Sequence, residues 1–463
     1  MAPRSNVSSP RNGRLPPSSP AQAPAPRDKA ATKQKMTLQD LVNRLHPTVK
    51  EILFTQRYFW HVAAAVLVAD SILTLAIIRF VAYTEIDFST YMQQAQQFLA
   101  DGQRNYSQIK GDTGPCVYPA GHLFFYSIIH RLTDGGKNLR VGQYLFGGLY
   151  MISQALMVAI YQKAGAPAIL LPILASSKRL HSIYALRMFN DGVAMTIMFS
   201  AILLLANHKY RMGTVVTSLA LSVKMNILLF VPALAVILFR ARGFWPGLVD
   251  GLTLVLVQVL VSLPFSLTHP FEYFSQAFDL SRVFLYKWTV NLRFLPEEVF
   301  LDVRLSMALL LVHAGLLIAF GWYKWTAISR IGASSWFRAQ WRAKEVLSPK
   351  FIVLSLLTSN LIGIICARSL HYQFYAWYAQ SLPLLLWNVN LQGTTKAILP
   401  IAIEVAWNTY PSTNTSSLLL CASNLLLLLG LFKMDHAGLE ASSSTSNGIR
   451  SKSSSASGTQ KKD

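Results

Sequence analysis

Asp87 is the residue in this sequence most suited to chemistry, and the cations that could act with it lie far away along the chain. A carboxylate can remove a proton from a hydroxyl group. Lysine, arginine and histidine can bind the oxygens of a phosphate. The candidate cations are Arg187, Lys224, Lys287, Arg368 and His371. These residue types suit transfer of a group from a phosphate-bearing donor to a hydroxyl acceptor, if the fold gathers them in one site.

Asp87 lies in a polar stretch, residues 84–122, that follows the first long apolar run. Within 87–99 the apolar residues recur at helical spacing, and four glutamines fall on the other face. This pattern predicts a short helix lying on the membrane with Asp87 at its N-terminus. Asp87 would then be a helix N-cap or a catalytic carboxylate, and the residues alone leave both open. Glu85 is a candidate supporting contact to substrate.

The segment GDTGPCVYPAGH, residues 111–122, holds three glycines and two prolines. That composition argues against a helix and predicts a fixed turn. Its backbone could meet a sugar or a diphosphate, and Tyr118 and His122 are its candidate side chains. The alternative is a structural loop packed on the protein surface.

A second polar motif, RSLHYQFY at 368–375, follows a later apolar run. Arg368 and His371 could contact a phosphate, with Tyr372 and Gln373 beside them. The alternative for Arg368 is a side chain that extends from the end of a span to lipid headgroups. The same two interpretations apply to the other candidate cations.

The elements that must position these residues are membrane helices. Of the 463 residues, 52% are hydrophobic and only 14% are charged, so we expect an all-α polytopic membrane protein surrounded by lipid. The net charge of +21 could indicate a nucleic-acid partner, but the basic residues lie between apolar runs, as the positive-inside rule expects. No nucleic-acid partner is therefore predicted. Three scattered cysteines offer neither metal spacing nor a disulfide framework.

The apolar runs give about twelve spans with both termini in the cytosol. Residues 1–57 carry ten Lys and Arg against three Asp and Glu, and are predicted to form a disordered basic tail and a surface helix. The first basic residues are not followed by the apolar core of a cleavable signal peptide. The catalytic membrane domain occupies 58–433, and 434–463 is a second disordered cytosolic tail.

The connections divide between the two sides of the membrane. The loops 84–139 and 268–301 are predicted to be lumenal, while 323–350, with six Lys and Arg and one Glu, is predicted to be cytosolic. All the candidate residues then share the lumenal face, which indicates a site. Three short apolar runs could be re-entrant or broken helices: 167–177, 214–222 and 397–407.

A carboxylate and several cations beside apolar walls suit transfer from a lipid-phosphate donor. The phosphate would meet the cations while the carboxylate takes the proton of an acceptor hydroxyl, and one in-line displacement would invert the sugar carbon. A transporter or flippase is the competing class, but no internal repeat relates the two halves. A structural scaffold would not need two polar loops rich in Asp, Arg, His and Trp.

Five segments carry a resemblance to a known family: TEIDFSTYM (84–92), GDTGPCVYPAGH (111–122), RLHSIYALRMFNDG (179–192), SLALSVKMN (218–226) and SLHYQFYAWY (369–378). The chain resembles the endoplasmic-reticulum dolichyl-phosphate-mannose-dependent alpha-1,3-mannosyltransferases of N-glycan assembly. The resemblance implies a GT-C glycosyltransferase fold, a dolichyl-phosphate-mannose donor and a dolichyl-diphosphate-linked five-mannose acceptor. It also implies a multi-pass protein of the endoplasmic-reticulum membrane, without a cofactor and independent of metal.

The resemblance also assigns roles to residues. Asp87 is expected to be the general base, and Arg368 and His371 are expected to meet the donor phosphate, with Tyr372 and Gln373 nearby. One block is expected to contact acceptor or donor mannose, although its last two residues could instead cap a helix: His181, Arg187, Asn190 and Asp191. A GT-C enzyme with a different acceptor is the remaining alternative, against which only the resemblance argues.

Overall fold

The computed structural model describes residues 45–279, 285–342 and 344–435, so the two predicted tails lie largely outside the described residues. The elements of the first half are α2 (Pro47–Phe54), α3 (Phe59–Phe80), α4 (Phe88–Leu99), η1 (Tyr106–Gln108), β1 (Lys110–Gly111), β2 (Gly114–Pro115), α5 (Ala120–Leu132), α6 (Leu139–Lys163), α7 (Leu170–Ala175), α8 (Lys178–His181), η2 (Ser182–Leu186), α9 (Asn190–Ala206) and α10 (Tyr210–Val223). Those of the second half are η3 (Met225–Phe230), α11 (Val231–Arg242), α12 (Phe244–Ser266), α13 (Pro270–Ala277), η4 (Tyr286–Trp288), α14 (Glu297–Leu301), α15 (Val303–Phe320), η5 (Gly321–Trp325), α16 (Ile328–Ile331), α17 (Ala333–Arg342), α18 (Pro349–Cys366), η6 (Tyr372–Trp377), η7 (Ala379–Ser381), α19 (Leu382–Asn388), α20 (Gly393–Asn408) and α21 (Asn414–Phe432).

Seven helices of the described chain are long and apolar enough to cross a membrane, and a bent pair would make eight. The expected all-α membrane class is therefore confirmed, whereas the count of about twelve spans is not. The three short apolar runs became α7, α10 and α20, with 6, 14 and 16 residues. A straight helix needs about 20 residues to cross the hydrocarbon core, so these segments contribute to the body without meeting that length alone.

The long helices differ strongly in burial. α18 is buried along almost its whole length, together with most of α9. By contrast, α12 and α15 leave most of their apolar side chains exposed, including Val255, Leu260 and Leu311. Apolar helices that expose such faces fit a bilayer better than water. The core of the molecule thus lies around α9 and α18, with α12 and α15 at its lipid-facing boundary.

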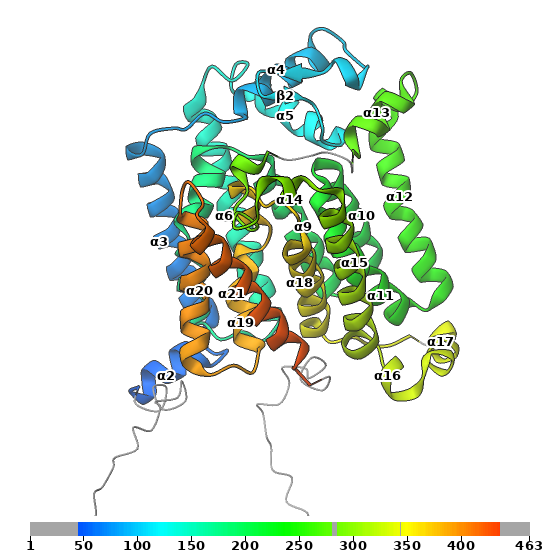
Figure 1. Cartoon of the computed structure of the whole chain (residues 1–463). Coiled ribbons are helices and arrows are strands. Elements are labelled where there is room, and N and C mark those ends of the chain that lie inside the picture. The colour runs from blue at the N-terminus through cyan, green and yellow to red at the C-terminus, as the bar shows by residue number, and fades with distance from the viewer. Residues whose placement is uncertain (1–44, 280–284, 343, 436–463) are drawn as a thin grey trace, which may run out of the picture. The chain divides into compact units, whose positions relative to one another are not determined.

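Shorter elements gather at the two ends of the long helices (Figure 1). α4, β2 and α5 lie beyond one end. α2, α16, α17 and the C-terminal end of α21 lie at the opposite end. The described chain therefore begins and finishes at the same end of the long helices.

The helix predicted at 87–99 is present as α4, but its apolar face packs against protein rather than lipid. Phe88, Tyr91, Met92 and Ala95 are buried, and the ring of Tyr91 lies 4.6 Å from that of Tyr126 on α5. Burial of these side chains against another helix removes their apolar area from water without a membrane. The interpretation of α4 as a helix lying on the membrane is thus corrected to a helix packed on α5.

The glycine-rich segment forms the predicted turn only in its first part. β1 and β2 pair antiparallel, with Gly111 opposite Gly114. From Ala120 onward the chain is helical, so the expectation of a non-helical segment is wrong for its last three residues. A Cβ at Gly121 would lie 2.2 Å from Ser222 Oγ on α10, so this glycine allows the two helices to approach closely.

A second, smaller apolar cluster anchors the loop between α4 and α5. Tyr106 and Cys116 pack against Phe265 of α12 and Tyr273 of α13. The hydroxyl of Tyr106 donates to the carbonyl of Tyr118 at 2.8 Å. These contacts give the loop a defined position over the ends of the long helices.

Candidate functional site

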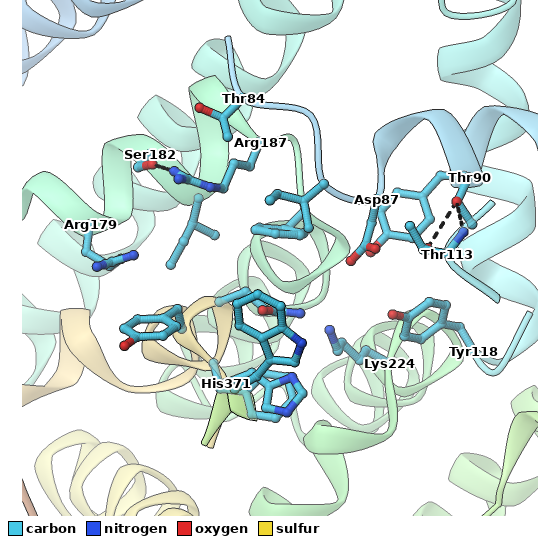
Figure 2. A pocket seen from close by; sticks show the side chains of 18 of the residues that line it. Thr84, Asp87, Thr90, Thr113, Tyr118, Arg179, Ser182, Arg187, Lys224 and His371 are labelled. Atoms are coloured by element: carbon cyan, nitrogen blue, oxygen red, sulfur yellow. Dashed lines mark hydrogen bonds between the residues drawn. The ribbon is translucent and has the colours of Figure 1, made fainter. Parts of the chain in front are cut away.

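A cavity of about 890 Å³ lies at the α4–α5 end of the molecule (Figure 2). Its walls come from α4, the residues after β1, the bent segment 178–189, Lys224, and the turn 371–374. A cavity of this size can enclose a drug-sized ligand. Four Lys and Arg side chains and one carboxylate line it, so its charge favours an anionic ligand.

Asp87 is the N-cap residue of α4 by position, yet its side chain makes no capping hydrogen bond. Glu85 takes that role, because its Oε1 accepts from the backbone N–H of Ser89 at 3.0 Å. Figure 2 shows the Asp87 carboxyl pointing into the cavity. The simple N-cap interpretation of Asp87 is therefore not supported by the geometry.

The protonation of Asp87 reflects its surroundings. Burial raises the pKa of this carboxyl above its ordinary value, while a hydrogen bond from Thr113 and the charge of Lys224 act in the opposite direction. Thr113 is itself held by Thr90, whose Oγ1 accepts from the Thr113 N–H at 2.9 Å. A carboxylate with a raised pKa is a stronger proton acceptor once ionised.

The glutamines of α4 hold the hairpin that forms one cavity wall. Gln93 Nε2 donates to Asp112 Oδ2 at 2.6 Å, and Gln93 Oε1 accepts from the Asp112 N–H at 2.9 Å. One turn further, Gln97 makes the same two-way contact with the backbone of Lys110, at 2.6 and 3.1 Å. The second face of α4 therefore positions Thr113 and the residues that follow it.

Lys224 reaches the cavity from the end of α10 through an enclosed position. Its Nζ lies 2.7 Å from Asp191 Oδ2 and donates to Asn190 Oδ1 at 2.8 Å. The ammonium also faces the rings of Tyr118 and Phe374, at 5.2 and 5.4 Å from their centres. This environment keeps Lys224 in one orientation beside Asp87.

Asn190 and Asp191 open α9 but do not cap it, since the N-cap position belongs to Phe189. Neither lines the cavity. Besides holding Lys224, Asp191 accepts from Trp377 Nε1 at 2.5 Å. The two residues therefore support the site from behind its wall.

The bent helix pair turns two arginines toward the cavity. The helical segments Lys178–Leu186 and Asn190–Ala206 meet at 108°, and Met188 at the break has a φ of 52°. This left-handed conformation is uncommon for a residue with a side chain. The break places Arg187 at the cavity, where its guanidinium donates to Ser182.

Arg179 lies on the same wall as Arg187. Its Nη2 donates to the carbonyl of Trp407 at 2.8 Å, and its guanidinium lies 4.9 Å from the centre of the Tyr372 ring. The hydrogen-bond and ring partners described for both arginines are thus neutral groups, although the charge of Glu404 also acts on Arg179. Positive charge held by neutral partners remains available to a bound anion.

The candidate residues of the motif at 368–375 lie in two different places. His371, Tyr372 and Gln373 line the cavity, and the His371 ring stacks on Phe374 with 5.3 Å between ring centres. Arg368 does not line the cavity. It donates to Ser306 Oγ at 2.7 Å and lies over the ring of Phe300.

Two predicted histidines lie outside the cavity lining. His122 is buried behind it, with Nδ1 3.2 Å from Asn190 Nδ2 and its ring 4.5 Å from that of Tyr118. His181 is buried in the body, 2.8 Å from Asp70 Oδ1. The contact joins α8 to α3 and gives His181 a structural position.

The remaining predicted residues divide in the same way. Tyr118 lines the cavity, whereas Glu85 and Lys287 do not. Lys287 is exposed, with its ammonium 4.9 Å from the centre of the neighbouring Trp288 ring. Trp288 itself reaches the cavity.

Several cavity residues were missed by the sequence reasoning, among them Arg179, Ser182, Trp288, Asn408 and Tyr410. Arg179 had a signal, since it belongs to the recognised block at 179–192. Trp288 and Tyr410 stack on each other at 6.3 Å although 122 positions separate them, and no local pattern announces such a pair. Among the described residues no group of three or more His, Cys, Asp and Glu side chains could hold a metal ion.

Comparisons by sequence with known proteins converge on one family. The family model described as ALG3 protein matches residues 64–417. The Dol-P-Man:Man(5)GlcNAc(2)-PP-Dol alpha-1,3-mannosyltransferase of Arabidopsis thaliana is 43% identical over 80% of this chain and 87% of its own length. The proteins of that name from Cryptococcus neoformans and Homo sapiens are each 41% identical, over 85% and 82% of this chain and 93% and 88% of their own lengths. Among solved structures, that of ArnT from Cupriavidus metallidurans bound to undecaprenyl phosphate covers 83% of this chain and 78% of its own, at 13% identity and a TM-score of 0.37.

Proposed function

The chain belongs to the ALG3 protein family, and from this premise we propose that it transfers mannose from dolichyl-phosphate-mannose to the Man(5)GlcNAc(2) acceptor on dolichyl diphosphate. The new linkage is alpha-1,3, and the enzyme is a glycosyltransferase, as the names of relatives at 35 to 43% identity state for those proteins. One observation carries the assignment of the site. The Asp87 carboxyl and Lys224 border one cavity that arginines also line.

The proposed reaction is a single displacement. The acceptor hydroxyl oxygen attacks C1 of the donor mannose, and Asp87 takes the hydroxyl proton. The bond between C1 and the phosphate oxygen breaks, and its electron pair leaves with dolichyl phosphate. Attack opposite the leaving group inverts the configuration at C1. The raised pKa of Asp87 increases its strength as the proton acceptor in this step.

Stabilisation of the leaving phosphate is assigned to N–H-donating side chains of the cavity wall. Arg179, Arg187 and His371 line the cavity, and an arginine fork matches phosphate oxygens in two contacts. A phosphate that gains charge as it departs is stabilised by groups already in place. Lys224 is assigned a different role, since it already pairs with Asp191. Its charge lowers the pKa of Asp87.

Arg368, expected at first to bind the donor phosphate, is retained in the proposal only as a test case. Its guanidinium contacts Ser306 and Phe300 rather than the cavity. Tyr372 and Gln373 remain candidates for contacts to the donor, because both line the cavity.

We assign a GT-C fold to the catalytic membrane domain, 58–433, within the endoplasmic-reticulum membrane. The cavity end faces the lumen, and both termini face the cytosol. A basic cytosolic segment at 323–350 agrees with this orientation.

The deciding experiment supplies purified protein with dolichyl-phosphate-mannose and a panel of lipid-linked glycans, in the presence of a chelator. We expect one mannose to be added to the five-mannose acceptor in alpha-1,3 linkage, with inversion, and no nucleotide sugar to replace the donor. If no product formed from that acceptor but product formed from another, the enzyme would have to be assigned a different acceptor. A chelator-induced loss that added Mg²⁺ or Mn²⁺ restores would refute the proposed independence from metal.

A further inference from the structure

A second hollow, here called the side groove, lies on the other face of α4. It has a volume of about 560 Å³. Phe88 and Met92 of α4 are buried beneath it, while Gln96, His130 and Asp134 bring polar groups to its walls. The groove is thus apolar beneath and polar at its sides, as small-molecule sites are.

The wall opposite α4 is a closely constrained turn after α5. Asp134, Gly135 and Gly136 have φ values of 50°, 69° and 88° in succession. The Gly135 N–H donates to the carbonyl of His130 at 2.8 Å. A Cβ at Gly136 would lie 2.6 Å from Met92 Cγ. Three consecutive residues in the left-handed region need such support, so the turn packs Gly136 against Met92 and leaves Asp134 exposed at the rim of the groove.

The charge of the side groove differs from that of the cavity. Glu85 and Asp134 contribute carboxylates, and Lys137 Nζ lies 3.8 Å from Asp134 Oδ2. Amide and imidazole groups supply further donors and acceptors at Gln96 and His130. The groove therefore carries no excess of positive charge for a phosphate. Mixed donors and acceptors above an apolar surface suit a neutral, hydroxyl-rich ligand such as a sugar.

The two hollows share one wall. Along the entry to α4, Thr84, Ile86 and Asp87 line the cavity, whereas Glu85, Phe88 and Ser89 line the side groove. Glu85 connects the residues of the two linings. It follows Thr84 of the cavity in the chain, and its carboxylate accepts a hydrogen bond from the N–H of Ser89, which lines the side groove. Asp87 at the cavity and Glu85 at the side groove therefore stand on either side of the entry to α4.

The acceptor is too large for the cavity alone. The relatives' names give an acceptor of five mannoses and two N-acetylglucosamines, and the cavity of about 890 Å³ must also hold the donor mannose and its phosphate. A hollow of that volume encloses a ligand of about drug size, so most of the acceptor glycan lies outside it. Resting on the function proposed above, we infer that the side groove binds mannose units of the acceptor other than the one that receives the new mannose.

The test uses a combined variant of the full-length protein, Gln96→Ala/His130→Ala/Asp134→Asn. Asparagine at position 134 preserves tolerance of positive φ. Arg131→Ala is the matched control, since Arg131 is exposed, adjoins His130 and lines neither hollow. With the complete acceptor we expect the combined variant to raise the acceptor KM about tenfold, with kcat and the donor KM unchanged. With acceptors shortened by an exomannosidase that still react, the rise should shrink to less than about twofold.

A second measurement avoids turnover. The free Man(5)GlcNAc(2) glycan, without its lipid, is titrated against the Asp87→Asn variant with and without the three groove substitutions, and binding is read by ligand-detected NMR. We expect about tenfold weaker binding when the groove is altered. Equal glycan binding, or equal KM changes for complete and shortened acceptors, would overturn the inference. Failure of the proposed function looks different, because the unaltered protein would then form no product from the five-mannose acceptor.

Discussion

The two ends of the membrane helices hold their arginines in different ways. At the end opposite α4, Arg240 donates to Glu345 at 2.8 Å, and the buried Asp250 accepts from Arg211 and Arg242 at 3.0 Å each. At the cavity end, the described partners of Arg179 and Arg187 are a carbonyl, a hydroxyl and an aromatic ring.

This difference separates charge used for structure from charge used for a ligand. A cation closed by a carboxylate ties two segments together and presents little net charge. A cation held by neutral groups keeps its charge for an anion that arrives later. Lys224 combines both arrangements, since Asp191 pairs with it while it still borders the cavity. Substitutions at the cavity end should therefore impair transfer, and those at the other end should impair stability.

The largest expected effect is that of Asp87→Asn. Loss of the proton acceptor should lower kcat by about 10²- to 10⁴-fold, while donor binding persists. Because burial raises the pKa of Asp87, its ionised form costs stability at neutral pH, so the variant should unfold at an equal or higher temperature. Measurements of mannose transfer check the expected loss of kcat, and thermal unfolding in detergent checks the expected stability. Turnover near that of the unaltered protein would exclude Asp87 as the base.

Arg187→Gln should have the next largest effect. Removal of one charged contact to phosphate costs about 1.5–3 kcal/mol, so kcat/KM for the donor should fall about 10- to 100-fold. Arg368→Gln is the matched control, because its guanidinium lies away from the cavity, and it should change the same constant less than about threefold. A larger loss from Arg368→Gln than from Arg187→Gln would restore the original assignment of Arg368 to the donor phosphate.

Asp250→Asn tests the opposite end. Two arginines would lose their shared carboxylate, but both are partly exposed, so the loss in unfolding free energy should be about 1–3 kcal/mol rather than the larger cost of a fully buried pair. Thermal unfolding measures it. Specific activity per folded molecule should remain that of the unaltered protein. A selective loss of transfer would show that the two ends are coupled.

The smallest expected effects are shifts in pH dependence. The base must be ionised, so transfer should fall as the pH drops through the pKa of Asp87, which burial holds above the usual value of about 3.9. Lys224 lowers that pKa and Asp191 raises it. Lys224→Gln should therefore move the acidic limb of kcat to higher pH, and Asp191→Asn should move it to lower pH, each by up to about one unit. Limbs that move in the same direction would indicate structural damage instead.

The sequence was sufficient for the membrane class, for α4 and for the family. These rest on local signals: long apolar runs, the helical spacing of residues 87–99, and segments such as 84–92 that the comparisons support. Each signal is contained within a few turns of chain. The helical spacing alone could not show whether Asp87 caps α4 or faces a site. That depends on Glu85, whose carboxylate accepts the hydrogen bond from the Ser89 N–H instead.

The composition of the cavity depends on contacts between distant segments. Arg368 and His371 are three positions apart, yet only His371 faces the cavity, since the chain carries Arg368 toward Ser306 on α15. Arg179 enters because the break at Met188 bends the chain by 108°. Neither outcome follows from residue types, because both depend on how helices far apart in sequence pack together.

The turn of α4 shared by the cavity and the side groove has a consequence for inhibition. A helix with its side chains is about 10–12 Å across, so a linker of about that length could join a phosphate-bearing group in the cavity to a sugar in the groove. The second group would then bind at a high effective concentration once the first is seated, and the combined affinity could exceed that of either part by 10²–10⁴. Such a bivalent ligand would exploit an arrangement that a phosphate site alone does not offer.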